Sequence, residues 1–360
     1  MTASYSLAER WLHWLALEPG LVRELSFDLE RQFAMPPRAE VAEAASRAVY
    51  VCGLARSGTT LLLNLLDQVD DFRSLSYRNM PFPMAPNLWR RVTSLATRNS
   101  VAAPRPHGDG MLVDFDSPEG FEEVFWRTFC DYSTGGGVLS ATAPSRDALA
   151  AFADYRALVA NPRGQAAGSE RRRYLSKNNN HLMRLEWLSQ QADSTTVLLF
   201  RHPVAAARSM HATHIRFAEE QSRNGFMRRY MAWLCHYEFG LDHKPFAFAA
   251  GAMQQHLDPR QLDYWLDYWC AVHEHILGVR GRAVLLLDYD RLCSEPTPTL
   301  GSLLDALGVD RRHAEALASQ VSRPRSINDE GVDRVLLERA LVIHRALRDS
   351  PSPATAGLDA

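Results

Sequence analysis

Short apolar runs, each followed by a segment with a helical period, recur along the chain. The first run, AVYVCG at 48–53, is rich in β-branched and aromatic residues, and TTLLLNLLDQ follows it with helical character. Similar runs near 172–176, 195–200 and 283–288 are typical of buried strands. Because strands that alternate with helices form parallel sheets, the pattern predicts an α/β fold with a doubly wound parallel sheet flanked by helices.

Three further segments between the predicted strands have helical patterns. Crossover helices are expected at 181–191 and 203–214. Another helix is expected at 117–129, where Ser117 suits the N-cap, Pro118 suits the first turn, and acidic residues come next.

The N-terminal segment 5–34 places Leu and Trp between charged positions on a helical period, and Pro19-Gly20 interrupts it. We expect residues 1–47 to form helices that pack on the main domain, because the polar face mixes acidic and basic residues. Binding of this segment to a membrane surface or to a partner is the alternative.

Residues 215–280 are also helical and carry many aromatic residues, among them Trp265 and Trp269, four positions apart on one face. Two interpretations stay open: a helical and loop insertion that forms a lid over an acceptor, or a plain helical core. We expect residues 1–348 to form a single domain and 349–360 a disordered tail.

Composition excludes several classes of protein. The net charge of −2 argues against a general nucleic-acid or membrane binder. The five cysteines are an odd number without a C-x-x-C pair, which favours reduced thiols over a disulfide framework or a zinc site. The N-terminus lacks a signal-peptide pattern, and no apolar run approaches the roughly 20 residues that span a bilayer. We therefore expect a cytoplasmic protein without a membrane span.

The segment GLARSGTTLLLNLL at 53–66 has the glycine spacing of a nucleotide-binding P-loop, but Thr59 stands at the lysine position. After a buried strand, successive backbone N–H groups and the N-terminus of the next helix can face one anion. Arg56 adds a planar guanidinium that suits two oxygens. The loop therefore predicts a P-loop-like anion site made by Arg56, Ser57, Gly58, Thr59 and Thr60.

This loop resembles the 5′-phosphosulfate-binding loop of sulfotransferases that use 3′-phosphoadenosine 5′-phosphosulfate (PAPS). It is most similar to the bacterial branch related to tyrosylprotein sulfotransferases, whose loop reads P-R-S-G-T-T-L, with Ala55 here in place of the usual proline. LLFRHPVAAARSM resembles the family's 3′-phosphate motif, which implies that Arg201 and Ser209 bind that phosphate.

Two weaker matches extend the resemblance to roughly residues 48–310. YLSKNNNHLMRLEWL resembles the strand that ends in a lysine directed at the sulfuryl group, here Lys177, and LLLDYDRLCSEP places Tyr289 near the nucleotide. All four motifs fall at the carboxyl ends of predicted strands, where open parallel sheets bind ligands.

The resemblance implies an in-line transfer of the sulfuryl group from PAPS to a hydroxyl of a small-molecule or peptide acceptor. Arg56 and Lys177 would stabilise charge on the leaving phosphate, and no metal is expected. The pairs His211-x-x-His214 and His273-x-His275 lack a third ligand at recognisable spacing. A P-loop kinase-like phosphotransferase and a catalytically inactive nucleotide-binding relative are the alternatives. The motifs specify neither the acceptor nor the oligomeric state.

The general base is the least determined part of the site. Relatives use a glutamate shortly after the first loop or a histidine in the lysine segment, but SLSYRNMPF has no carboxylate and Asn179 lies two residues after Lys177. We place His107 first, because similar bacterial sulfotransferases carry a histidine before a Pro-Glu helix start. Other candidates are Asp109, as a partner of His107, and Glu119, Glu122, Glu123 and His181.

Overall fold

The computed structural model of the chain describes most of the sequence. The described residues are 5–37, 41, 47–94, 103–104, 112–113, 117–130, 137–162, 172–248, 253, 257–279, 284–323 and 327–350.

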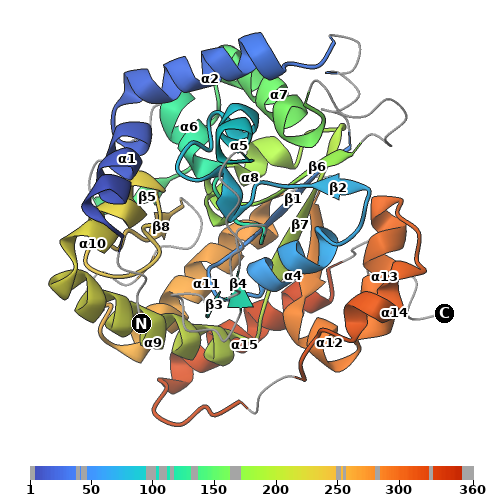
Figure 1. The fold of residues 1–360 in the computed structure, drawn as a ribbon. Helices are drawn as coiled ribbons and strands as arrows, with labels where there is room; N and C mark the ends of the chain where they lie inside the picture. The colour runs from blue at the N-terminus through green and yellow to red at the C-terminus, as the bar shows by residue number, and fades with distance from the viewer. Residues whose placement is uncertain are drawn as a thin grey trace.

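A five-stranded parallel sheet lies at the centre of the molecule (Figure 1). Its strands, in the order β2-β6-β1-β7-β9, are paired in parallel throughout. The predicted α/β fold and all four predicted strands are confirmed, with shifts of a few residues at the ends. The strands are β1 (Ala48–Gly53), β2 (Phe72–Arg73), β6 (Arg173–Lys177), β7 (Ser194–Phe200) and β9 (Val284–Asp288).

Helices cover both faces of this sheet, and β1 shows why its sequence is apolar throughout. Every residue of β1 is buried. Val49 and Val51 pack in a hydrophobic cluster with Leu62 and Leu300, whereas Tyr50 packs in a different cluster with Trp126. Because successive side chains of a strand point to opposite faces, a strand covered on both faces is expected to be apolar at most of its positions.

Among the described residues, helices and four short strands make up the rest of the regular structure. They are α1 (Leu7–Leu17), α2 (Gly20–Ala34), α4 (Thr59–Leu66), η1 (Tyr77–Asn79), α5 (Pro86–Ser94), β3 (Ala103–Pro104), β4 (Leu112–Val113), α6 (Glu123–Phe129), β5 (Leu139–Ser140), α7 (Arg146–Ala160), η3 (Asn179–Arg184), α8 (Leu185–Leu188), α9 (Pro203–Arg223), α10 (Gly225–Trp233), β8 (Phe246–Ala247), α11 (Leu262–Gly278), α12 (Tyr289–Ser294), α13 (Pro296–Leu307), α14 (His313–Ala318) and α15 (Arg334–Arg348).

The N-terminal pattern gives two helices with a break at Pro19, as its sequence predicts. Ser6 caps α1 by accepting from the backbone N–H of Glu9, and the Glu9 side chain accepts from the backbone N–H of Ser6 in return. Leu17 and Phe27 are buried against the α6–α7 side of the sheet. The outer face of these helices keeps large apolar residues exposed: Leu7, Trp11, Leu21, Leu25, Leu29 and Phe33.

The helix predicted at 117–129 is wrong at its start, because α6 begins at Glu123. The backbone at Pro118 pairs instead with Ser76 as an antiparallel bridge. The N–H of Glu119 donates to Leu75 O at 3.0 Å. Pairing with this neighbouring segment takes up the backbone groups that the first helical turn would use, so tertiary contacts override the favourable Ser117-Pro118 cap.

Two predicted helices differ in extent from those observed. The 181–191 segment is a 3₁₀ turn, η3, followed by the short helix α8, whereas the helix predicted at 203–214 continues to Arg223 as α9. The first segment connects β6 to β7, which lie on either side of β1, and α9 lies in the connection from β7 to its neighbour β9.

The region 215–280 includes a core helix. Trp265 and Trp269 of α11 are fully buried, and α11 packs against α9 and α15. The aromatic residues of α11 therefore belong to the core.

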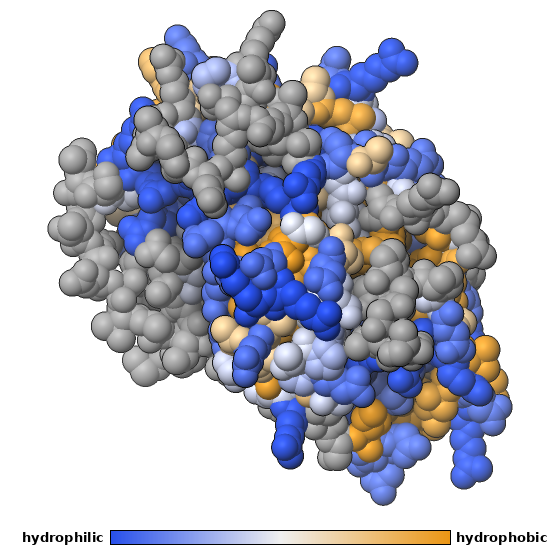
Figure 2. Space-filling model, turned by 90° about the vertical axis from the view of Figure 1, so that its right-hand side faces the viewer, coloured by the Kyte–Doolittle hydropathy of each residue, from blue (hydrophilic) through white to orange (hydrophobic). Residues whose placement is uncertain are grey.

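The face that carries α13 and α14 is mostly polar (Figure 2). Hydrophobic residues show there mainly in the gaps between polar ones and in one group at the lower right.

Among the described residues, no helix combines the length and the apolar character that crossing a membrane requires.

Candidate functional site

The four sequence motifs meet at one edge of the sheet. Gly53 ends β1 and Lys177 ends β6, while Arg201 follows the last residue of β7 and Tyr289 follows the last residue of β9. These four strands are neighbours and parallel. Their carboxyl ends therefore form one continuous edge, which is the usual place for a ligand in an open parallel sheet.

The loop after β1 has a backbone shape that depends on Gly58. Arg56 and Gly58 have positive φ angles of 74° and 97°, and α4 starts directly afterwards at Thr59, with Thr60 as its second residue. A Cβ added at Gly58 would lie 2.2 Å from Cδ2 of Tyr289. The loop is thus packed against the Tyr289 ring at a separation that leaves room for glycine alone.

Arg56 connects this loop to the second motif. Its Nε donates to Ser209 Oγ at 3.0 Å, across 153 positions in the sequence. Nη1 of Arg201 lies 3.5 Å from the backbone oxygen of Arg56. The structure therefore brings Arg56, Arg201 and Ser209 into one group.

Tyr289 closes the other side of this group. The Arg201 guanidinium carbon lies 5.0 Å from the centroid of the Tyr289 ring, within cation–π distance. Burial raises the pKa of Tyr289 to about 12, so the phenol stays neutral at physiological pH. An uncharged ring and a guanidinium form a surface suited to a planar, anionic ligand.

Two polar atoms of the group lack a hydrogen-bond partner among the described residues. Arg201 Nε and Ser57 Oγ are both buried and have no hydrogen-bond partner there. A buried donor without a partner costs about 1 to 3 kcal/mol, so such atoms call for an acceptor.

Lys177 forms a second group with Glu119. Its Nζ lies 3.8 Å from Glu119 Oε1, and both side chains are largely buried. Glu119 also accepts from Tyr77 OH at 2.8 Å and from the backbone N–H of Gly120 at 2.8 Å. A Cβ at Gly120 would lie 2.4 Å from Lys177 O, so glycine permits the close approach of the two segments.

Thr59 and Asn179 join the two groups. Thr59 Oγ1 donates to Asn179 Oδ1 at 3.2 Å, and Nδ2 of Asn179 lies 3.5 Å from Glu238 Oε1. The sequence motifs include neither Tyr77, Gly120 nor Glu238. Tyr77 lies in a stretch that offers no carboxylate, and no local signal marks Glu238.

Glu122 and His181 contact each other in the core. His181 Nε2 lies 2.8 Å from Glu122 Oε1, and both side chains are almost completely buried. Burial alone would raise the pKa of Glu122, but His181 and a hydrogen bond from Trp126 Nε1 contribute to lowering it below its ordinary value. These contacts favour a structural role for both residues.

Glu123, the third acidic candidate in this stretch, is also enclosed. It forms a buried ion pair with Arg184 and accepts from Asn178 Nδ2 at 2.6 Å. His107 and Asp109 lie outside the described residues.

The two histidine pairs pack in other ways. His211 Nε2 lies 2.8 Å from Arg260 O, and His214 Nδ1 accepts from the N–H of Gly240 at 3.2 Å. The His273 ring stacks on Trp269 and the His275 ring stacks on Phe248. Within the described ranges, one group of acidic and histidine side chains lies close enough together to share a cation, and none of these four histidines belongs to it.

Comparison with solved structures finds similar bacterial proteins. Sulfotransferase STF9 from Mycobacterium avium is 17% identical, with a TM-score of 0.47 and coverage of 99% of this chain and 86% of that chain. Sulfotransferase STF1 from Mycobacterium tuberculosis H37Rv is 15% identical, with a TM-score of 0.46 and coverage of 89% and 82%. A sulfotransferase from Alicyclobacillus acidocaldarius is 15% identical, with a TM-score of 0.37 and coverage of 84% and 95%. No curated protein sequence matches the chain.

A family model described as "Sulfotransferase family" matches residues 48–243, more than half of the 360-residue chain. The match includes the loop after β1 and the residues Lys177, Arg201 and Ser209. It supports a transferase activity of the sulfuryl-transferring kind. The chain belongs to the sulfotransferase family.

Proposed function

We propose that this protein transfers the sulfuryl group of PAPS to a hydroxyl group of a small-molecule or peptide acceptor. The observation that carries the proposal is the group formed by Arg56, Ser209 and Arg201, in which Arg56 Nε donates to Ser209 Oγ at 3.0 Å and Arg201 reaches the backbone of Arg56. In this group the loop that would bind the 5′-phosphosulfate, which carries Arg56, contacts Arg201 and Ser209, which would bind the 3′-phosphate.

The residues present fit such a nucleotide. Arg201 Nε and Ser57 Oγ are buried donors without partners among the described residues, and phosphate oxygens are strong acceptors. The backbone N–H groups at the start of α4 favour an anion as well. Tyr289, neutral and packed on Arg201, offers a ring against which an adenine base can stack.

Arg56 and Lys177 supply the positive charge that the reaction needs. The leaving group in sulfuryl transfer is a phosphate on which negative charge develops. A guanidinium and an ammonium that are already positioned stabilise that charge without reorganisation of solvent. Lys177 is about nine-tenths buried, which strengthens its electrostatic effect relative to a solvated lysine.

We assign Glu119 as the base that accepts the proton of the acceptor hydroxyl. Its carboxylate is fixed by Tyr77 and Gly120 and lies 3.8 Å from Lys177 Nζ, so it is adjacent to the proposed sulfuryl position. His107, the first candidate from the sequence, stays a prediction.

Two other functions remain as alternatives with less support. In a P-loop kinase a lysine occupies the position of Thr59, whereas here the Thr59 hydroxyl is buried and donates to Asn179. An inactive nucleotide-binding relative would have no need for Glu119 beside Lys177.

Two measurements test the proposal: nucleotide binding first, and then transfer of the sulfuryl group to an acceptor. Calorimetric titration with 3′-phosphoadenosine 5′-phosphate is expected to give one site, with much weaker binding of ADP–Mg²⁺. Incubation with ³⁵S-labelled PAPS and a panel of phenols, alkyl alcohols and tyrosyl peptides is expected to yield a labelled acceptor. Preference for ADP–Mg²⁺ would support the kinase, and tight nucleotide binding without label transfer to any acceptor would support the inactive relative.

A further inference from the structure

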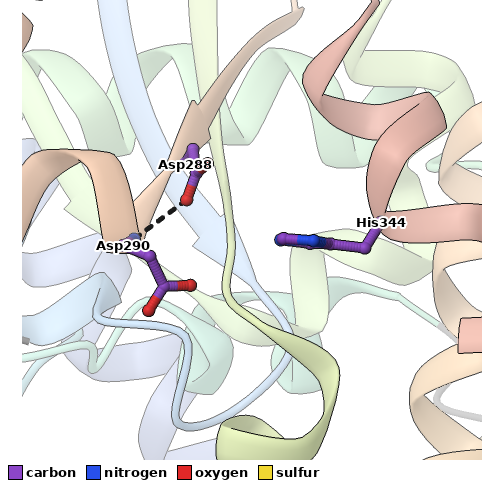
Figure 3. A group of neighbouring side chains, drawn as sticks. All are labelled: Asp288, Asp290 and His344. Carbon is purple, nitrogen blue, oxygen red and sulfur yellow. Dashed lines mark hydrogen bonds between the residues drawn. The ribbon is translucent and has the colours of Figure 1, made fainter. Parts of the chain in front are cut away.

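Three side chains, two of them from the residues that flank Tyr289 in the sequence, point toward one another (Figure 3). Asp288 ends β9, Asp290 is the second residue of α12, and His344 lies on α15. One carboxylate oxygen from each aspartate and one ring nitrogen of His344 all lie within 4.8 Å of one another.

His344 is buried without a polar partner. Its side chain is 8% exposed, and its Nε2 atom is buried with no hydrogen-bond partner among the described residues. The ring packs against Phe200 and Trp269, at centroid distances of 5.7 and 6.3 Å, and extends toward the two aspartates (Figure 3). A buried imidazole that faces two carboxylates and has a ring nitrogen without a hydrogen-bond partner is an unusual arrangement unless something binds there.

Local hydrogen bonds fix the orientation of each aspartate. Asp288 Oδ1 accepts from the backbone N–H of Asp290 at 2.9 Å, which caps α12. Asp290 Oδ2 accepts from the backbone N–H of His202 at 2.6 Å. One oxygen of each carboxylate is therefore held by the backbone, which leaves Asp288 Oδ2 and Asp290 Oδ1 as the oxygens that can bind a further group.

We propose that Asp288, Asp290 and His344 bind a divalent transition metal ion such as Zn²⁺. Two carboxylates and one imidazole are a common ligand set for this class of ion and balance its charge. Ligand atoms about 2.1 Å from one ion lie roughly 3 to 4 Å apart, so the observed separations of up to 4.8 Å need only a small contraction.

Arg348 competes with the ion for Asp288. Its Nε lies 3.2 Å from Asp288 Oδ2, and its side chain is 57% exposed. An ion pair this exposed contributes little to stability, so the guanidinium can move into solvent when a metal ion binds. Arg348 and the metal ion therefore exclude each other at Asp288.

The ion would join three elements, namely β9, α12 and α15. Tyr289 lies between the two aspartates, and His202, held by Asp290, directly follows Arg201. A metal ion here fixes α15 to the segments that carry Tyr289 and Arg201. Its role is structural, and it takes no part in the transfer reaction.

The experiment is calorimetric titration of the full chain with Zn²⁺ after treatment with a chelator, without nucleotide. We expect one site, with His344→Phe and Asp290→Asn each weakening it at least tenfold. The phenyl ring retains the packing of His344, and the asparagine oxygen can still accept from His202. Arg348→Ala is expected to tighten Zn²⁺ binding several-fold, because it removes the competing cation.

Controls separate this site from adventitious binding. His313→Phe removes a histidine on α14, outside the group, and is expected to leave the Zn²⁺ affinity unchanged. Melting temperatures in chelator identify any variant that fails to fold. Three results would each overturn the proposal. The parent protein could fail to bind Zn²⁺, His344→Phe and Asp290→Asn could both bind Zn²⁺ as tightly as the parent, or Arg348→Ala could leave the Zn²⁺ affinity unchanged. Because no nucleotide is present, none of these results depends on the proposed function.

Discussion

Arg56 and Ser209 are joined by a hydrogen bond of 3.0 Å from the guanidinium Nε to the hydroxyl oxygen. The bond links the loop after β1 to the second turn of α9, and Arg201, just before that helix, contacts the backbone of the same arginine. The proposed nucleotide would contact both motifs, so the proposal requires them to lie beside each other. The contact between Arg56 and Ser209 agrees with this requirement.

Replacement of Arg201 tests the 3′-phosphate assignment. Loss of a charged hydrogen-bond donor costs roughly 1.5 to 3 kcal/mol, so Arg201→Ala is expected to weaken binding of 3′-phosphoadenosine 5′-phosphate about ten- to hundredfold in a calorimetric titration. Arg208→Ala is the matched control, because Arg208 also lies on the β7–α9 segment but donates to Asn328 O. Equal affinities for the parent and Arg201→Ala would remove Arg201 from the site.

The base assignment makes a kinetic prediction. Glu119→Gln keeps the size of the side chain and an oxygen that can accept from Tyr77, but it removes proton acceptance. We expect the turnover number with ³⁵S-labelled PAPS to fall about a hundredfold or more, with nucleotide affinity retained. Glu186→Gln, at an exposed position of α8, is the control. A near-parental rate for Glu119→Gln would move the assignment back to His107, the first candidate from the sequence.

Substitution of Gly58 distinguishes the cost of a steric clash with Tyr289 from the cost of a positive φ angle. Gly58→Ala introduces a methyl group 2.2 Å from the Tyr289 ring at a φ of +97°, and we expect a loss of roughly 2 to 5 kcal/mol in the free energy of unfolding. Gly137→Ala shares the positive φ, at +74°, but meets nothing within 4 Å. Urea unfolding should therefore show a smaller loss for Gly137→Ala, and equal losses would contradict the packing of Tyr289 against the loop.

Stability should fall below neutral pH, in part because of His273. Burial lowers its pKa from 6.5 to about 3, although a hydrogen bond to Trp269 O acts in the opposite direction. In the unfolded chain His273 therefore binds a proton as the pH falls through about 6.5, whereas in the folded chain it stays unprotonated until the pH is much lower. The stability contributed by neutral His273 is complete above about pH 6.5 and is lost as pH falls toward about 3.

Urea unfolding at several pH values between about 7 and 5 measures this dependence. One proton contributes at most about 1.4 kcal/mol per pH unit to the slope, and His273→Phe is expected to remove that contribution. His313→Phe, at a partly exposed histidine of α14, is the control. A slope that is the same in the parent and in His273→Phe would show that His273 is not the proton-linked group.

Much of the fold followed from local patterns. The run that forms β1 is apolar throughout and those of β7 and β9 are largely apolar, because both faces of the sheet are covered, and this pattern marks them as buried strands. The break at Pro19 and the start of α9 at Pro203 are local backbone effects, which a sequence states directly. The helix expected to start at Ser117 failed because its cap was favourable locally but the backbone found partners in the segment at 75–77.

The sequence by itself determined the motifs of the proposed nucleotide site and their order, because a glycine loop between a strand and a helix, or an arginine after a strand, carries its chemistry within a few residues. Only the tertiary structure placed Glu119 beside Lys177, joined Thr59 to Asn179, and directed His344 at Asp288 and Asp290. Those pairs are 54 to 120 positions apart. Contacts at such separations depend on how the helices cross the sheet, and no periodicity or short motif encodes that.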